Sequence, residues 1–212
     1  MPTRSFQPSD VLRLLQPPSE RDLADIQSFF QQTGSLHPKH GYIVKREIQR
    51  HTTVRTLILS LQQSADPHAS RILCELLGER HARSAISALL ACLTHDDSDV
   101  RYEAADALAK IREPATGPAL FTRLTIERES HVQAMLIRAL GAVGYRPAIS
   151  DLVTALSASE ASVRASAAWS LGALQASEAY QALERVQANE TDTYARQQIA
   201  DALVACSVST TL

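Results

Sequence analysis

Residues 97–111, DSDVRYEAADALAKI, form a unit that recurs at a fixed spacing along the chain. With Val100 taken as position 0, the equivalent residues stand 31 or 32 residues apart, at Ala69, Val132, Val163 and Ala195. Position +8 is leucine in all five copies, and position −3 is a carboxylate in all five. The leucines are Leu77, Leu108, Leu140, Leu171 and Leu203, and the carboxylates are Asp66, Asp97, Glu129, Glu160 and Asp192. A period of this length predicts an array of stacked structural repeats.

The apolar positions of the unit have the spacing of an α-helix. At 100° per residue, positions 0, +4, +8 and +11 fall within about 80° of arc, so each unit presents one stripe for burial. Position +7 is small in the later copies, which would let neighbouring helices approach closely. These small residues are Ala107, Ala139, Ser170 and Ala202. We expect each unit to contain a first helix, a turn and this second helix, with first helices at 84–94, 117–125, 148–157 and 179–188.

Two polar positions are interpreted as structural. The carboxylate at −3 stands where the second helix begins, so its oxygens are expected to accept from unpaired backbone N–H groups there. Arginine occupies position +1 in three copies and is long enough to reach a carboxylate of the adjacent unit. These arginines are Arg101, Arg164 and Arg196. We therefore expect a ladder of ion pairs along the stack and no catalytic role for the repeated carboxylates.

Composition supports an all-α protein, because 45% of the 212 residues are hydrophobic and only 5% are aromatic. The net charge is −2, and residues 82–212 hold eleven Lys/Arg against fifteen Asp/Glu, which excludes the clustered positive charge of a nucleic-acid-binding surface. We expect a helical cap and loop at 1–40, the repeat array at 41–206 and a disordered tail at 207–212. No stretch is apolar enough for a membrane span, so a cytoplasmic protein is expected.

The sequence shows no convergent set of metal ligands. His37 and His40 have half of a metal-site spacing within a loop, but a metal needs three or four ligands. The three cysteines are isolated, and we interpret them as reduced core residues; they are Cys74, Cys92 and Cys206. We therefore expect neither a metal nor a cofactor. The helix expected at 42–63 has a basic side that is either solvated or contacts an acidic partner.

The candidate binding surface is the side of the second helices opposite the buried stripe, which we expect to be concave. Positions +2 and +6 point away from the stripe and position +3 lies at the edge of this surface. Together they supply its residues: Tyr102, Glu103, Asp106, Met135, Arg138, Trp169, Gln198 and Asp201. Trp169 is the only tryptophan, and it either anchors a partner at the surface or is buried by curvature of the stack. We expect the partner to be an extended or helical protein segment with apolar anchors and some positive charge.

DSDVRYEAADALAKI, EASVRASAAWSLGAL and DTYARQQIADALVAC resemble HEAT-like repeats of the short bacterial type found in phycobilin lyases. The resemblance covers about residues 54–206 and implies a right-handed α-solenoid of about five helical hairpins. Two functions follow as expectations: a non-enzymatic adaptor or scaffold, or a phycobilin lyase that handles a bilin chromophore. The array also resembles deoxyhypusine hydroxylase, whose repeated His-Glu pairs bind iron. The matching positions here hold no histidine; they are Tyr102-Glu103, Ala134-Met135, Ala165-Ser166 and Gln197-Gln198.

The lack of a convergent set of His, Cys, Asp and Glu ligands in the sequence predicts that the protein carries no structural metal. Protein purified without an affinity tag should contain no stoichiometric zinc or iron in elemental analysis, because three or four ligands do not converge. Added divalent metal should leave the unfolding midpoint unchanged. One equivalent of retained zinc or iron after desalting would contradict the prediction.

Overall fold

The computed structural model describes residues 52–207. The cap expected at 1–40, residues 42–51 of the expected basic helix and residues 208–212 of the expected tail lie outside the described residues. Within 52–207 all regular structure is helical, which confirms the all-α class. Ser207, which was assigned to the tail, is the last residue of a helix.

The described chain alternates first and second helices, as the repeat spacing predicts. The first helices are α4 (Val54–Gln63), α6 (Ile86–Cys92), α8 (Gly117–Ile126), α10 (Ile149–Ala155) and α12 (Tyr180–Gln187). The second helices are α5 (Pro67–Glu79), α7 (Ser98–Ile111), α9 (Ser130–Ala142), α11 (Ala161–Ala173) and α13 (Thr193–Ser207). A short 3-10 turn precedes α6, α8, α10 and α12, so each of these first helices starts tightly after the preceding unit; the turns are Arg83–Ala85, Pro114–Thr116, Arg146–Ala148 and Ser177–Ala179.

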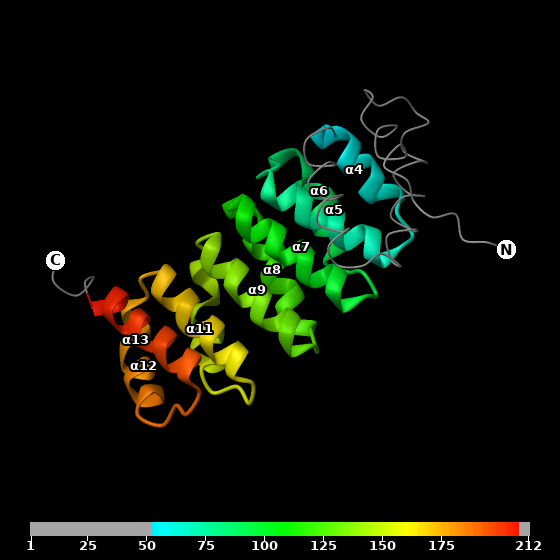
Figure 1. Cartoon of the computed structure of the whole chain (residues 1–212). Coiled ribbons are helices and arrows are strands. Elements are labelled where there is room, and N and C mark those ends of the chain that lie inside the picture. The colour runs from blue at the N-terminus through cyan, green and yellow to red at the C-terminus, as the bar shows by residue number, and fades with distance from the viewer. Residues whose placement is uncertain (1–51, 208–212) are drawn as a thin grey trace.

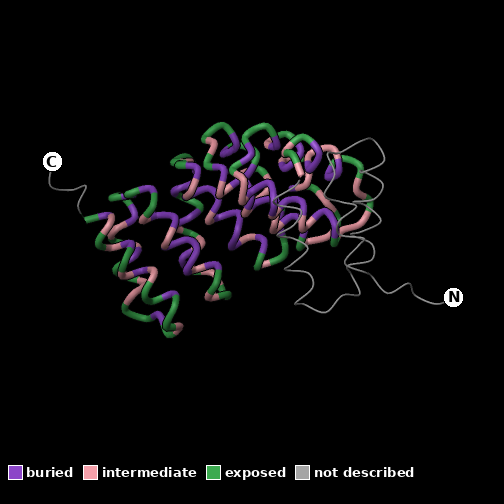
Figure 2. Tube along the Cα trace, turned by 45° about the horizontal axis from the view of Figure 1, so that its top comes forward, coloured by how far each residue is buried: buried purple, intermediate pink, exposed green. Residues whose placement is uncertain are grey.

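The helices form two layers that extend as a solenoid. The second helices α5, α7, α9, α11 and α13 lie side by side in one row, and each first helix packs on the second helix of its own unit (Figure 1). Buried residues run along the inner sides of both layers, whereas the turns are mostly exposed (Figure 2). The second helices therefore present one continuous outer surface, here called the second-helix face.

The repeated apolar positions form the core, as predicted. Leu77, Leu108, Leu140 and Leu171 are fully buried, and the other stripe positions of α7 are buried with them. Leu203 is only half-buried, because no further helix of the described chain covers α13. The buried leucines act by removing apolar surface from water, which contributes on the order of 2 kcal/mol for each side chain.

Successive second helices approach closely at position +9. A Cβ added to Gly78 would lie 2.7 Å from the Cα of Ala107, and one added to Gly141 would lie 2.7 Å from the Cα of Ser170. The same construction at Gly172 gives 3.0 Å to the Cα of Ala202. Each of these close contacts thus has a small residue at +7, as predicted, on one of the two helices. The glycine at +9 on the other helix was not predicted from the sequence.

The expected carboxylate caps form only where the residue is aspartate. Asp97 accepts from the N–H of Val100 at 3.0 Å, Asp192 accepts from Ala195 at 2.8 Å, and Asp66 caps α5 in the same way. Glu129 and Glu160 make no side-chain cap, so the prediction is wrong for these two. Their side chains are one methylene longer, which moves the carboxylate beyond the N–H groups that an aspartate reaches.

Two of the three expected inter-unit arginine contacts are present. Arg101 binds both carboxylate oxygens of Glu127 at 2.9 and 3.0 Å, and Arg164 binds those of Glu190 at 2.7 and 2.8 Å. Arg196 instead donates to the backbone carbonyl of Glu190 within its own unit, so that part of the prediction is wrong. Glutamate stands at position −5 only in alternate units, and no later described unit follows α13. The ion pairs therefore repeat every 63 residues.

Both glutamates remain ionised to low pH. Burial alone would raise the pKa of Glu127, but hydrogen bonds from Arg101, Arg123 and two backbone N–H groups lower it to about 2. Hydrogen bonds from Arg164 likewise lower the pKa of Glu190 to about 2, against the opposing effect of burial. The Glu127 and Glu190 side chains are only 1% and 2% exposed, so both ion pairs lie inside the stack.

Replacing Leu140 by alanine should lower the free energy of unfolding by about 2 to 5 kcal/mol, because its side chain is fully buried between neighbouring units. Urea unfolding followed by circular dichroism measures the change. Val204→Ala serves as the control, since Val204 is 68% exposed. Equal midpoints for the two variants would contradict the assigned repeat register.

The glutamate pKa values predict acid sensitivity. Both values are lower in the folded protein than their ordinary 4.5, so the stability they contribute is present above about pH 4.5 and is lost as pH falls toward 2. The variant Glu127→Gln/Glu190→Gln should be less stable at pH 7, and its unfolding midpoint should vary less between pH 5 and pH 2. Glu178→Gln removes a half-exposed pair with Arg146 and should keep the wild-type profile. A wild-type profile in the double variant would refute the assignment.

Candidate functional site

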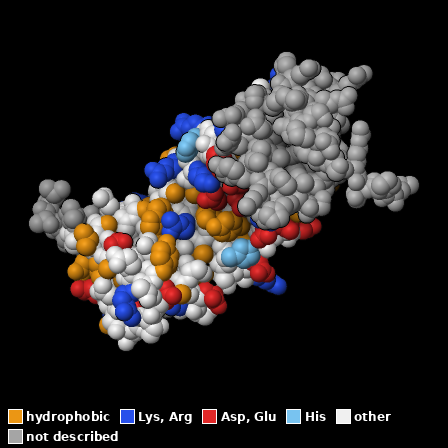
Figure 3. All heavy atoms as spheres, in the orientation of Figure 1, with side chains coloured by type: hydrophobic (Ala, Val, Ile, Leu, Met, Phe, Trp, Pro, Cys, Tyr) orange, Lys and Arg blue, Asp and Glu red, His pale blue; other side chains and the backbone are white. Residues whose placement is uncertain are grey.

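The second-helix face carries two hollows that meet over α9. Hydrophobic side chains gather over its central helices, with positively charged side chains between them (Figure 3). The first hollow, here the tyrosine hollow, lies over the N-terminal halves of α7, α9, α11 and α13 and has a volume of about 520 Å³. The second, here the arginine hollow, lies near the C-terminal ends of α5 and α7 and beside α9 and α11, and also measures about 520 Å³. Met135 and Arg138 line both.

Each hollow draws residues from several units. The tyrosine hollow is lined by Tyr102, His131, Ala134, Met135, Arg138, Ala161, Ser162, Ser166, Asp192 and Tyr194. The arginine hollow is lined by His81, Asp106, Ala109, Lys110, Ile111, Arg112, Met135, Arg138, Ala142 and Trp169. The two hollows together form a groove. Stacking of the repeats assembles this groove, because no single unit supplies all of its lining.

Met135 forms the buried part of this groove. It is only 9% exposed and belongs to the core, so the expectation that it points outward is wrong. Position +3 lies beside the buried stripe on the helix, and both neighbouring second helices, α7 and α11, pack against α9. Met135 therefore supplies an apolar floor that both hollows share.

Arg138 and Trp169 form the central contact of the face. Both occupy position +6, on adjacent helices, and the Arg138 guanidinium carbon lies 4.4 Å from the centroid of the Trp169 ring. This distance is within the range of a cation–π interaction. Both side chains are half-buried. Of the two readings of Trp169, the structure supports the surface position, because the ring lines a hollow beneath an arginine.

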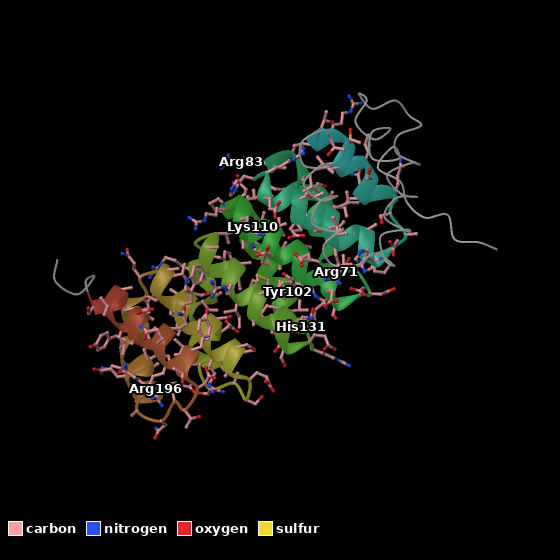
Figure 4. The ribbon with its side chains drawn as sticks, in the orientation of Figure 1. Arg71, Arg83, Tyr102, Lys110, His131 and Arg196 are labelled. Atoms are coloured by element: carbon pink, nitrogen blue, oxygen red, sulfur yellow. The ribbon has the colours of Figure 1, made fainter. Side chains whose placement is uncertain are left out.

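Aromatic residues surround the tyrosine hollow. Tyr102 on α7 and His131 on α9 lie next to each other, with ring centroids 6.1 Å apart (Figure 4). Tyr194, at the start of α13, is 58% exposed and lines the same hollow. Tyr194 was not predicted, because the expected surface was built from positions +2, +3 and +6 alone. The signal available was the ring at position −1 in several units, where His68 and His131 also stand.

The acidic residues predicted for the site separate into different environments. Asp106 lines the arginine hollow, where the Lys110 ammonium lies 2.5 Å from its carboxylate. Glu103 lines neither hollow, and burial together with the nearby Glu75 and Asp106 carboxylates raises its pKa. Gln198 and Asp201 on α13 also lie outside both hollows. The structure thus brings together five of the eight predicted residues: Tyr102, Asp106, Met135, Arg138 and Trp169.

Two further findings concern metals and membranes. Across residues 52–207, no three or more His, Cys, Asp or Glu side chains are arranged to hold a metal ion. None of the helices in that range has the length and apolar character needed to cross a bilayer. Cys74 and Cys206 are buried, as expected, whereas Cys92 is half-buried.

Solved structures with a similar fold include designed repeat proteins. An engineered protein aligns with a TM-score of 0.59 and 19% identity over 94% of this chain and 98% of its own. A designed armadillo repeat protein in complex with the peptide (KR)4 aligns with a TM-score of 0.58 and 16% identity over 94% and 98%. The complex of CpcE and CpcF of phycocyanin lyase from Nostoc sp. PCC7120 reaches only 0.40 at 16% identity, over 96% of each chain. These likenesses concern the fold alone.

Among curated protein sequences, none matches this chain. The HEAT repeats profile matches it twice, at residues 54–133 and 117–204. The two matches begin 63 residues apart, which is also the spacing between Arg101 and Arg164. Since they cover more than half of the sequence, the chain belongs to the HEAT repeat family.

Proposed function

We propose that this protein is a non-enzymatic, cytoplasmic adaptor or scaffold that binds an extended or helical segment of another protein along the second-helix face. The observation that carries the proposal is the half-buried Trp169 ring in the arginine hollow, in contact with Arg138, which lines both hollows. Tryptophan, tyrosine and arginine are the residues that most often dominate binding energy in protein interfaces.

The shape of the face suits a segment of chain. Each hollow has a volume of about 520 Å³, and both open on the same surface with a shared floor at Met135. A bound segment would place successive side chains in the two hollows while its backbone crosses α9. The designed armadillo protein, which has a similar fold, binds a peptide, and this supports the same mode of use here.

Trp169→Ala should weaken binding of the partner at least about tenfold, because truncating a central aromatic anchor commonly costs about 2 kcal/mol or more. The partner is first identified by capture on the wild-type protein and then titrated against each variant by calorimetry. Helical circular dichroism and the unfolding midpoint should stay close to wild type, because Trp169 is half-buried at the surface.

Tyr180→Ala is the matched control, since this half-buried aromatic residue begins α12 in the other layer. It should leave affinity unchanged. A Trp169→Ala protein that unfolds early yet binds normally while folded would place Trp169 in the core and remove the proposed site. Specific retention of a bilin chromophore instead of a protein segment would favour the lyase alternative.

A further inference from the structure

The arginines of the described chain differ in their partners. Six of them form ion pairs with carboxylates, and five of these six pairs join different units; the six are Arg71, Arg83, Arg101, Arg123, Arg146 and Arg164. Among the other arginines of residues 52–207, Arg112 and Arg138 form no ion pair with a carboxylate of the described chain, and both line the arginine hollow. The hollow therefore holds two guanidinium groups whose charge is not neutralised by a carboxylate of residues 52–207.

Contact with Trp169 bears on how Arg138 can bind an anion. The guanidinium carbon lies 4.4 Å from the centroid of the Trp169 ring, and this contact limits the orientations that the side chain adopts. The N–H donors of a guanidinium lie in its plane, so they remain available at its edge for a two-point contact with a carboxylate. A carboxylate bound there would have the geometry of the Arg101–Glu127 pair.

The carboxylate that already lines this hollow forms an ion pair with a lysine. Asp106 is the acidic residue that lines it, and Lys110 lies 2.5 Å away. Arg112 and Arg138 add two further positive charges, so the lining has an excess of positive charge. A carboxylate from outside would meet favourable potential here, whereas a lysine or arginine would meet repulsion.

The tyrosine hollow is more apolar, although it shares Arg138 with the arginine hollow. Tyr102, Met135 and Tyr194 give it apolar walls, and its carboxylate, Asp192, accepts the N–H of Ala195 at the start of α13. An apolar side chain of a partner would bury surface there, at about 25 cal/mol for each Å² removed from water. The two hollows therefore select different side chains at adjacent positions.

We propose that the partner segment carries a carboxylate that binds Arg138, next to an apolar side chain that fills the tyrosine hollow. This inference rests on the proposed function and names the chemistry of its partner. It replaces the expectation of positive charge in the partner, because Asp106 is neutralised by Lys110 and Glu103 lies outside the hollows. A (KR)4-type peptide, which binds the designed armadillo protein, should bind weakly here.

The test is selection of a random-peptide library on the full-length protein, followed by a double-mutant cycle. The selected peptides should carry Asp or Glu beside Leu, Ile, Phe or Met. Changing that peptide carboxylate to an amide should weaken binding to wild type about tenfold or more, but should have little effect on binding to Arg138→Gln. Arg185→Gln makes the same charge change on α12 and should behave as wild type. Circular dichroism of each variant confirms folding.

The outcomes separate the two levels of the proposal. Peptides that bind with Trp169 dependence but carry no carboxylate, or whose carboxylate is equally important for wild type and Arg138→Gln, overturn the partner chemistry and leave the proposed function intact. Selection of basic peptides that bind the same face would likewise overturn the partner chemistry and leave the proposed function intact. Absence of any peptide whose binding depends on Trp169 overturns both the inference and the proposed function.

Discussion

The close approach of successive second helices is the constraint on which the other features depend. At Gly141, an added Cβ would lie 2.7 Å from the Cα of Ser170. The space between the backbones of α9 and α11 at that point is therefore too small for a methyl group. Helices fixed this tightly cannot slide by one turn without a clash. Equivalent positions therefore stay level across the row, which is why the Arg138 guanidinium and the Trp169 ring, both at +6, are in contact.

A second, polar set of contacts secures the ends of the helices. Arg101 and Arg164 each bind a glutamate of the following unit and also the carbonyls of their own turn, at 2.7–2.9 Å. One guanidinium thus satisfies buried acceptors in two units, which apolar side chains cannot do. Because the glutamates stand in alternate units, the structural period of these contacts is two units, whereas the leucine stripe repeats in every unit.

The leucine stripe and the outward positions could be predicted because each depends on the period of one helix. The groove could not, since it depends on how neighbouring helices are offset. Met135 illustrates the limit: its angle on α9 suggested exposure, but packing by α7 and α11 leaves it 9% exposed. Tyr194 shows the converse, because a residue in the first turn of α13 lines the tyrosine hollow only through the way α13 stacks beside α11. Glu129 does not cap α9 for a different reason, which is that its side chain is longer than that of aspartate.

The backbone at the ends of the second helices adds one more argument about the arginine hollow. Position +12 has positive φ in four units, at His81, Arg112, Gly144 and Gln175. Glycine adopts this conformation without strain, and Gly144 has open space around it, whereas other residues lose on the order of 1 kcal/mol there. Two of the three non-glycine residues, His81 and Arg112, line the arginine hollow. Glycine at position 112 would relieve strain but would also remove a guanidinium group from the hollow. At Arg112, therefore, the strained backbone carries a side chain that adds positive charge to the face.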